Sequence, residues 1–295
     1  MQIRTDLAME EREIWEERMG KRTELAGVRA RHERRQGIEV DIVEILDERG
    51  EEALGKPKGR YVTLETDVLL RREEQAFERT AEELAREIRQ TLETEGSVLV
   101  AGLGNANITP DAIGPDTIGY ILVTQHLKES MPEQFKGFRS VTALQAGVMG
   151  TTGVESAKLI GAMRELTGAS CVIAVDALAS RSPERLCRTI QLTDAGIIPG
   201  SGIGNSRAAL NAETMGVPVI AIGVPTVVDA GTMCMELASR AGVELDGEKL
   251  GAESRMIVTP RDVDNRVKEA SRLIGYAIDL ALHDGLTVDD IESLL

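Results

Sequence analysis

Aromatic residues and cysteines are scarce in this 295-residue sequence. Phe, Trp and Tyr together make up 2% of the residues, so the chain has few side chains on which single-stranded nucleic acid could stack. The three cysteines, Cys171, Cys187 and Cys234, are odd in number and form no CxxC pair. This argues against a disulfide framework or a zinc ribbon and indicates a reducing compartment.

Positive charge and long apolar runs are lacking as well. The formal net charge of -15 argues against direct binding to nucleic acid, because contact with phosphate backbones needs a basic surface. No run of 18 apolar residues appears, and the first twenty residues are too charged for a signal peptide. We therefore expect a cytoplasmic protein that does not bind a membrane.

The apolar residues that are present follow an alternating strand and helix pattern. Strand-like segments at 97–104, 140–144, 171–175, 189–193 and 217–222 are separated by helical patterns near 116–128 and 153–166, from about 226, and over 262–283. Such alternation predicts an α/β fold with a mostly parallel sheet and helices on both of its faces. Since no linker divides residues 97–283, we expect residues 1–295 to form a single domain.

The first 72 residues differ from this pattern and are expected to form a small β/helical appendage. Residues 1–36 are highly charged and predict a helix or a partly ordered arm. The strand-like segments 40–46 and 61–65 flank a polar loop with glycine and proline, which favours a hairpin at the edge of the main sheet. An amphipathic helix over 73–95 then begins the α/β core of residues 73–295.

Two aspartates are the candidate catalytic residues. Asp111 lies in the loop after the apolar, glycine-rich run that begins at Ser97, and Asp176 directly follows the apolar run from Cys171. Ligands of parallel sheets bind beyond the carboxyl ends of the strands, where both aspartates are expected. Two carboxyl groups that share a proton supply one base for water and one acid, so the pattern favours hydrolysis.

Simpler roles are open for the same residues. An aspartate at a strand end is commonly a helix cap or a turn residue, and this is the first interpretation for Asp116 and Asp229. Asp111 and Asp176 are also suited to a hard metal ion with oxygen ligands. The three histidines are scattered without an HExxH motif, which disfavours a zinc peptidase of the usual kind.

Two glycine-rich loops follow strands of the predicted sheet. The loop Gly102-Leu-Gly104-Asn105 lacks the third glycine of the dinucleotide-binding fingerprint, because that position holds Asn107. The second loop, Gly200-Ser-Gly-Ile-Gly204, is typical of a backbone that approaches a ligand closely and equally of a plain connection.

Several longer segments resemble the germination protease family of spore-forming bacteria. They run in order along most of the chain and comprise Ile3-Arg-Thr-Asp-Leu-Ala8, Gly102-Leu-Gly-Asn105, Thr109-Pro-Asp-Ala-Ile-Gly-Pro115, Gly147-Val-Met-Gly150, Asp176-Ala-Leu-Ala-Ser-Arg181, Pro199-Gly-Ser-Gly202 and 216–229. The resemblance implies a hydrolase, an endopeptidase that degrades small acid-soluble spore proteins in the spore core during germination. It also implies a homotetramer and a fold similar to the hydrogenase maturation proteases.

The resemblance places the essential aspartates of the family on Asp111 and Asp176, and we expect no metal ion and no cofactor. Backbone amides of the loop 200–204 are candidates for stabilising the oxyanion. The resemblance further implies a zymogen whose propeptide is removed ahead of the Arg-Thr-Asp-Leu-Ala segment. Only three residues precede Arg4 here, and the part beyond Asp229 carries no further motif of the family.

Three alternatives stay open from the residues themselves. A metal-dependent hydrolase would use the same aspartates as ligands, and a chelator distinguishes it. A non-catalytic protein could bind a basic partner through its acidic surface, which low ionic strength would strengthen. A nucleotide-dependent enzyme is the weakest alternative and is testable by cofactor titration.

Overall fold

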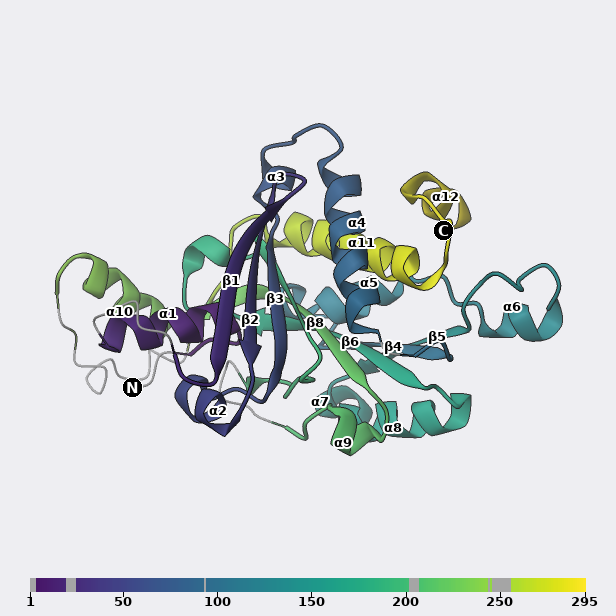
Figure 1. Ribbon diagram of the computed structural model, residues 1–295, viewed down its shortest axis with the longest axis horizontal. Coiled ribbons are helices and arrows are strands. Elements are labelled where there is room, and N and C mark those ends of the chain that lie inside the picture. The colour runs from purple at the N-terminus through teal and green to yellow at the C-terminus, as the bar shows by residue number, and fades with distance from the viewer. Residues whose placement is uncertain (1–3, 20–24, 93, 202–206, 244, 246–255) are drawn as a thin grey trace.

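The computed structural model describes residues 4–19, 25–92, 94–201, 207–243, 245 and 256–295, and Figure 1 shows their arrangement. Within these residues, nine strands form one sheet in the order β1-β2-β3-β7-β8-β6-β4-β5, with β9 paired to β8. No helix in the described part of the chain is long and apolar enough to cross a membrane. The strands are β1 Val28–Arg35, β2 Ile38–Ile45, β3 Gly59–Glu65, β4 Val98–Leu103, β5 Val141–Gly147, β6 Cys171–Ala179, β7 Thr189–Thr193, β8 Val219–Asp229 and β9 Ile257–Val258.

The sheet has a parallel core, which confirms the predicted α/β class. Strands β8, β6, β4 and β5 are parallel to one another, whereas β1, β2, β3 and β7 extend the sheet from β8 with antiparallel pairings. All residues of β4 and β8 are buried, as expected for strands covered on both faces. The carboxyl ends of the parallel strands therefore meet at one edge, where the candidate aspartates are expected.

Helices cover both faces of the sheet, as the pattern predicted. Helices α4 and α11 cross one face, and α8 and α9 lie against the other (Figure 1). The α-helices are α1 Ala8–Met19, α2 Glu48–Leu54, α3 Asp67–Leu70, α4 Ala76–Thr91, α5 Ile113–Ile118, α6 Gln125–Ser130, α7 Met149–Thr152, α8 Ser156–Thr167, α9 Ala212–Met215, α10 Ala230–Arg240, α11 Val263–Leu282 and α12 Val288–Leu294.

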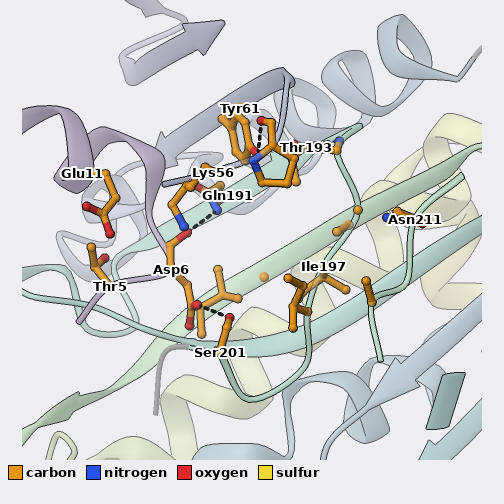
Figure 2. Close-up of a pocket in the computed structure, with 18 of the residues that line it drawn as sticks. Thr5, Asp6, Glu11, Lys56, Tyr61, Gln191, Thr193, Ile197, Ser201 and Asn211 are labelled. Carbon is orange, nitrogen blue, oxygen red and sulfur yellow. Dashed lines mark hydrogen bonds between the residues drawn. The ribbon is translucent and has the colours of Figure 1, made fainter. Parts of the chain in front are cut away.

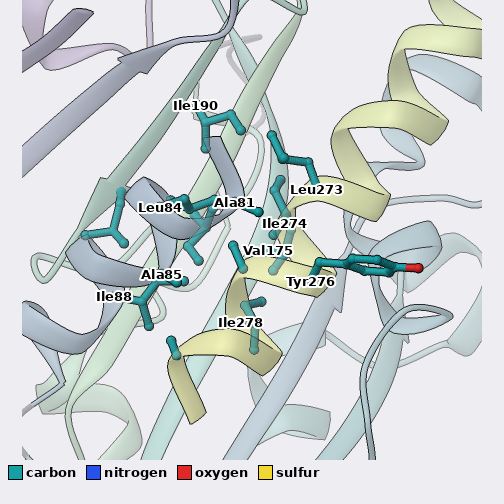
Figure 3. Packing of buried hydrophobic residues seen from close by; sticks show 14 of the residues in the cluster. Ala81, Leu84, Ala85, Ile88, Val175, Ile190, Leu273, Ile274, Tyr276 and Ile278 are labelled. Carbon is teal, nitrogen blue, oxygen red and sulfur yellow. The ribbon is translucent and has the colours of Figure 1, made fainter. Parts of the chain in front are cut away.

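The larger core lies between the sheet and the pair α4 and α11. Figure 3 shows Leu84 and Ile88 of α4 facing Ile274 and Ile278 of α11, with Val175 of β6 between them, and all are fully buried. Burial of each such side chain contributes about 1.5–3 kcal/mol. The core also contains side chains of β2 and β3, so the N-terminal strands share it with the parallel strands.

The predicted hairpin is present and joins the main sheet, but β1 and not the hairpin forms the edge. Strand β2 pairs antiparallel with β3, and β3 pairs with β7. The predicted polar loop between the two strands contains helix α2, whose N-cap Asp47 accepts hydrogen bonds from the backbone amides of Arg49 and Gly50. The N-terminal arm contains α1 as expected, but it also supplies β1, which was not predicted.

Helix α1 is attached to the loop after β6 by a buried carboxylate. Glu10 is fully buried and accepts hydrogen bonds from the Ser180 hydroxyl at 2.8 Å, the Arg181 amide at 2.6 Å and the Arg185 guanidinium at 3.0 Å. A buried charge is tolerated only when it is paired in this way. The contact holds the N-terminal segment against the end of β6.

Two further predictions about elements were wrong in their boundaries, and one of two predicted caps is absent. The helix expected near 116–128 is divided into α5 and α6, because the backbone turns between Gly119 and Thr124. The helix expected from about residue 226 begins at Ala230, since β8 continues to Asp229. Asp229 caps that helix by accepting a hydrogen bond from the Thr232 amide at 2.9 Å, whereas Asp116 lies inside α5 and is no cap.

Candidate active site

Asp111 lies in a short loop between β4 and α5. It ends the 3-10 turn Thr109–Asp111, and its carboxylate accepts a hydrogen bond from the Asn105 amide at 2.9 Å. The Thr226 hydroxyl of β8 donates to the Pro110 carbonyl at 2.6 Å, which ties the turn to the sheet. Gly104 has a φ of +104°, and a Cβ there would lie 2.1 Å from the Asp111 carbonyl oxygen, so this tight loop requires glycine.

Two further glycines bring the loop close to the sheet. A Cβ on Gly102 would lie 2.3 Å from the Gly114 carbonyl oxygen, and a Cβ on Gly114 would lie 2.4 Å from the Val175 carbonyl oxygen. Helix α5 therefore packs backbone to backbone on β4 and β6. This close packing places Asp111 beside the end of β4.

Asp176 lies inside β6 and not just beyond its end as predicted. The strand continues to Ala179 because its residues pair with β8, whereas its pairing with β4 ends at the contact of Val175 with Gly102. Asp176 is thus the first β6 residue beyond the pairing with β4. Its side chain is 5% exposed and accepts a hydrogen bond from the Ala177 amide at 2.9 Å.

The two carboxyl groups influence one another electrostatically. Burial raises the pKa of Asp176 well above its ordinary value, and the charge of Asp111 raises it further. Burial also raises the pKa of Asp111, although the Asn105 amide and the charge of Arg207 act in the opposite direction. The more deeply buried Asp176 is therefore the carboxyl that holds a proton more readily.

Asp111 and Asp176 line one cavity of about 190 Å³, which we call the aspartate cavity. Its other walls are mainly apolar and include Ile108, Ile198 and Ile257. These three isoleucine side chains are between 39% and 49% exposed, so they surround an open cleft rather than a sealed void. The cavity thus combines two carboxyl groups with apolar surface, as a site for a partly apolar peptide would.

A second pocket adjoins the aspartate cavity. It has a volume of about 230 Å³ and is more polar, with Glu11, Lys56, Tyr61 and Gln191 in its walls (Figure 2). We call it the neighbouring pocket. Both cavities are lined by Asp6, Leu178, Ile197, Ile198 and Ser201.

Asp6 is a third carboxylate at the site that the residue analysis did not select. It lies in the aspartate cavity with Asp111 and Asp176, and its charge contributes to the raised pKa of Asp176. In the sequence, Asp6 was marked as a site residue only by its place in the Arg-Thr-Asp-Leu-Ala segment. Residues 4–7 precede the first helix and show no strand pattern, so periodicity did not point to it. Only the tertiary structure brings this segment to the end of β6.

Other candidate groups are placed as follows. The loop 200–204 was considered for stabilising an oxyanion, and its residues 202–204 lie outside the described residues. His32 is exposed on β1, and His283 is buried at the end of α11. In the described part of the chain, no three His, Cys, Asp or Glu side chains are grouped as a metal ion would need.

Comparison with known proteins shows that the chain is a peptidase and to which peptidase family it belongs. The model of the family described as germination protease matches residues 4–239. A germination protease of Caldanaerobacter subterraneus is 43% identical over 99% of this chain and 98% of its own length. That of Clostridium tetani is 39% identical over the full length of both chains. The chain belongs to the germination protease family.

Two further similarities cover less of the proteins compared. The germination protease of Priestia megaterium is 45% identical over 77% of this chain and 64% of its own length. The solved structure of a [NiFe] hydrogenase maturation protease, HycI from Thermococcus kodakarensis, is similar over 65% of this chain and 98% of its own. Its sequence identity is 15% and its TM-score is 0.37.

Proposed function

We propose that this member of the family is an endopeptidase that begins the degradation of small acid-soluble spore proteins at germination, with Asp111 and Asp176 as the catalytic pair. The observation that supports the pair most directly is that both carboxyl groups line one cleft, and that Asp111 raises the pKa of Asp176. Perturbed carboxyl groups of this kind are typical of functional sites.

The proposed reaction uses one proton shared by the pair. Asp111, ionised, takes a proton from a water molecule as its oxygen attacks the scissile carbonyl carbon, and Asp176, protonated, donates to the carbonyl oxygen. The resulting diol collapses, the C–N bond breaks, and the proton on Asp111 passes to the amine nitrogen. Asp176 regains its proton from the second hydroxyl of the diol, which restores the starting state.

The proposed cellular setting follows from the same family. We propose that the protein acts in the cytoplasm of the spore core, that it is formed from a zymogen, and that it is a homotetramer. For the tetramer we expect light scattering to give about four times the chain mass of 31.9 kDa. A mass near that of one chain would contradict it.

Mass spectrometry of a digested substrate tests the catalytic proposal. A purified small acid-soluble spore protein is incubated with wild type, Asp111→Asn and Asp176→Asn, each with and without a chelator. We expect discrete cleavage by wild type, a loss of at least about 100-fold in both variants, and no effect of the chelator. The exposed Ser130→Ala variant, in α6 and outside both cavities, is the control and should cleave as wild type does.

The other possible results of this cleavage assay would each contradict a different part of the proposal. Loss of cleavage on chelation would assign the same aspartates to a metal ion. Full activity of either variant would contradict the pair, and the absence of cleavage by wild type would contradict the proposed substrate.

A further inference from the structure

The aspartate cavity and the neighbouring pocket share five lining residues, and two of these, Asp6 and Ser201, are joined by a hydrogen bond. The Ser201 hydroxyl donates to Oδ1 of Asp6 at 2.7 Å, and both residues line both cavities (Figure 2). A peptide that occupies both cavities must pass this contact. The geometry of the contact therefore affects whether one ligand can reach both cavities.

Asp6 also pairs with the part of the β6 edge that β4 leaves unpaired. Its amide donates to the Ala179 carbonyl at 2.9 Å, and its Oδ2 accepts from the Ala179 amide at 2.8 Å. Successive strand residues face opposite edges, so the carbonyl of Ala177 faces the same edge as that of Ala179. Ala177 lines the aspartate cavity, which places a main-chain acceptor for an extended peptide beside Asp176.

The Asp6 backbone is held by buried residues, whereas Ser201 lies in an exposed turn in which its amide donates to the Ile198 carbonyl at 3.2 Å. The Gln191 side chain of β7 donates to the Asp6 carbonyl at 3.1 Å and accepts from the Ala8 amide at 2.8 Å. The next residue, Leu7, is fully buried. Ser201 is exposed, and its hydrogen bond to Asp6 joins this turn to the core.

We propose that Asp6 and Ser201 are a positioning pair that aligns the two cavities into one groove, and that the neighbouring pocket binds the substrate residues on one side of the scissile bond. The ligand class is an extended peptide, paired through its main chain with β6. The inference rests on the proposed function, because it assigns the neighbouring pocket to the same substrate. It makes Asp6 a positioning residue and leaves the chemistry to Asp111 and Asp176.

Peptide binding separates this proposal from a merely structural role. Overlapping fluorescein-labelled peptides that cover a small acid-soluble spore protein are titrated against the full chain carrying Asp176→Asn, and the tightest binder is shortened from each end. We expect one truncation to weaken binding about tenfold, because it empties the neighbouring pocket. Ser201→Ala should weaken binding of the long peptide about fivefold to tenfold and change that of the truncated peptide less than twofold.

The variants include their own controls. Asp6→Ala should act in the same direction as Ser201→Ala and more strongly, since it removes both contacts of the carboxylate. If Asp6→Ala lowers the melting temperature, its effect on peptide binding does not test the positioning role. Ser201→Ala then provides the test, because Ser201 is exposed and its replacement leaves the core intact. Ser130→Ala is the matched serine variant outside both cavities and should bind both peptides as the parent does.

Three results would overturn the proposal. One is that no peptide binds, another is that Ser201→Ala leaves binding of the long peptide unchanged, and the third is that it weakens the long and truncated peptides equally. Cleavage of the same spore protein by wild type is followed separately by mass spectrometry. No cleavage with intact, Ser201-dependent peptide binding would refute the proposed reaction and support the groove.

Discussion

At the scale of the residue, Asp176 is placed where its ionised form is disfavoured. It is 5% exposed, accepts a hydrogen bond from the Ala177 amide, and has Asp111 and Asp6 as neighbouring charges that raise its pKa. A carboxyl group whose pKa is raised in the folded state lowers stability as pH rises above its unfolded value of about 3.9. The site therefore reduces the stability of the fold at neutral pH.

Asp176→Asn should remove this pH dependence. Below about pH 4 the carboxyl is protonated in both folded and unfolded states, so the variant and wild type should have similar melting temperatures. As pH rises, the unfolded state of wild type loses its proton first, and the variant should become more stable by about 2–4 °C at pH 7. Calorimetry from pH 4 to pH 8 checks this, and a variant less stable than wild type at pH 7 would contradict it.

At the scale of the element, the packing of α5 on the sheet determines where Asp111 lies. Gly114 has backbone atoms of Leu103 and Val175 within 2.4 Å of a hypothetical Cβ, so no side chain fits there. An added methyl group must push α5 away from β4 and β6. Because Asp111 immediately precedes this helix, the displacement should alter the aspartate cavity as well as stability.

Gly114→Ala should therefore lower the free energy of unfolding by about 2 kcal/mol and reduce cleavage more than tenfold. Gly137→Ala is the matched control, because nothing lies within 4 Å of a Cβ at that position and its φ is not positive. Denaturant unfolding and the cleavage assay measure the two effects. Equal stability of both variants would show that α5 adjusts to the extra methyl group.

Strand β1 shows at the same scale why element prediction failed. Its sequence VRARHERR carries charged residues on both faces, so it lacks the apolar alternation by which strands are recognised. It forms because β2 offers a complete antiparallel partner and because Arg35 pairs with the buried Glu83 and Glu87 of α4. Charged residues are also typical of edge strands, where they discourage pairing with another chain.

At the scale of the whole molecule, one sheet joins the N-terminal strands to the parallel core. Strand β3 pairs with β7 along five residues, and β2, β3 and α4 contribute to the same core as β4 and β6. The proposal of a single domain predicts one cooperative thermal transition with equal calorimetric and van't Hoff enthalpies at low protein concentration. Two resolved transitions, with the N-terminal strands unfolding first, would contradict it.

The sequence by itself determined the α/β class, the hairpin, the positions of β4, β7 and α11, and the choice of Asp111 and Asp176. These features depend on local patterns, namely apolar runs, helical spacing and polar residues next to buried strands. The chain order also placed both aspartates at the carboxyl edge of the sheet.

Only the tertiary structure decided how the site is completed. Asp176 is inside β6 because β8 pairs with it beyond the last pair of β6 with β4, and sequence periodicity does not reveal where such a pairing stops. Asp6 reaches the same cavity through contacts with Ala179 and Ser201, which are more than 170 residues away in the chain. Such long-range contacts depend on the packing of the whole sheet, and no local pattern encodes them.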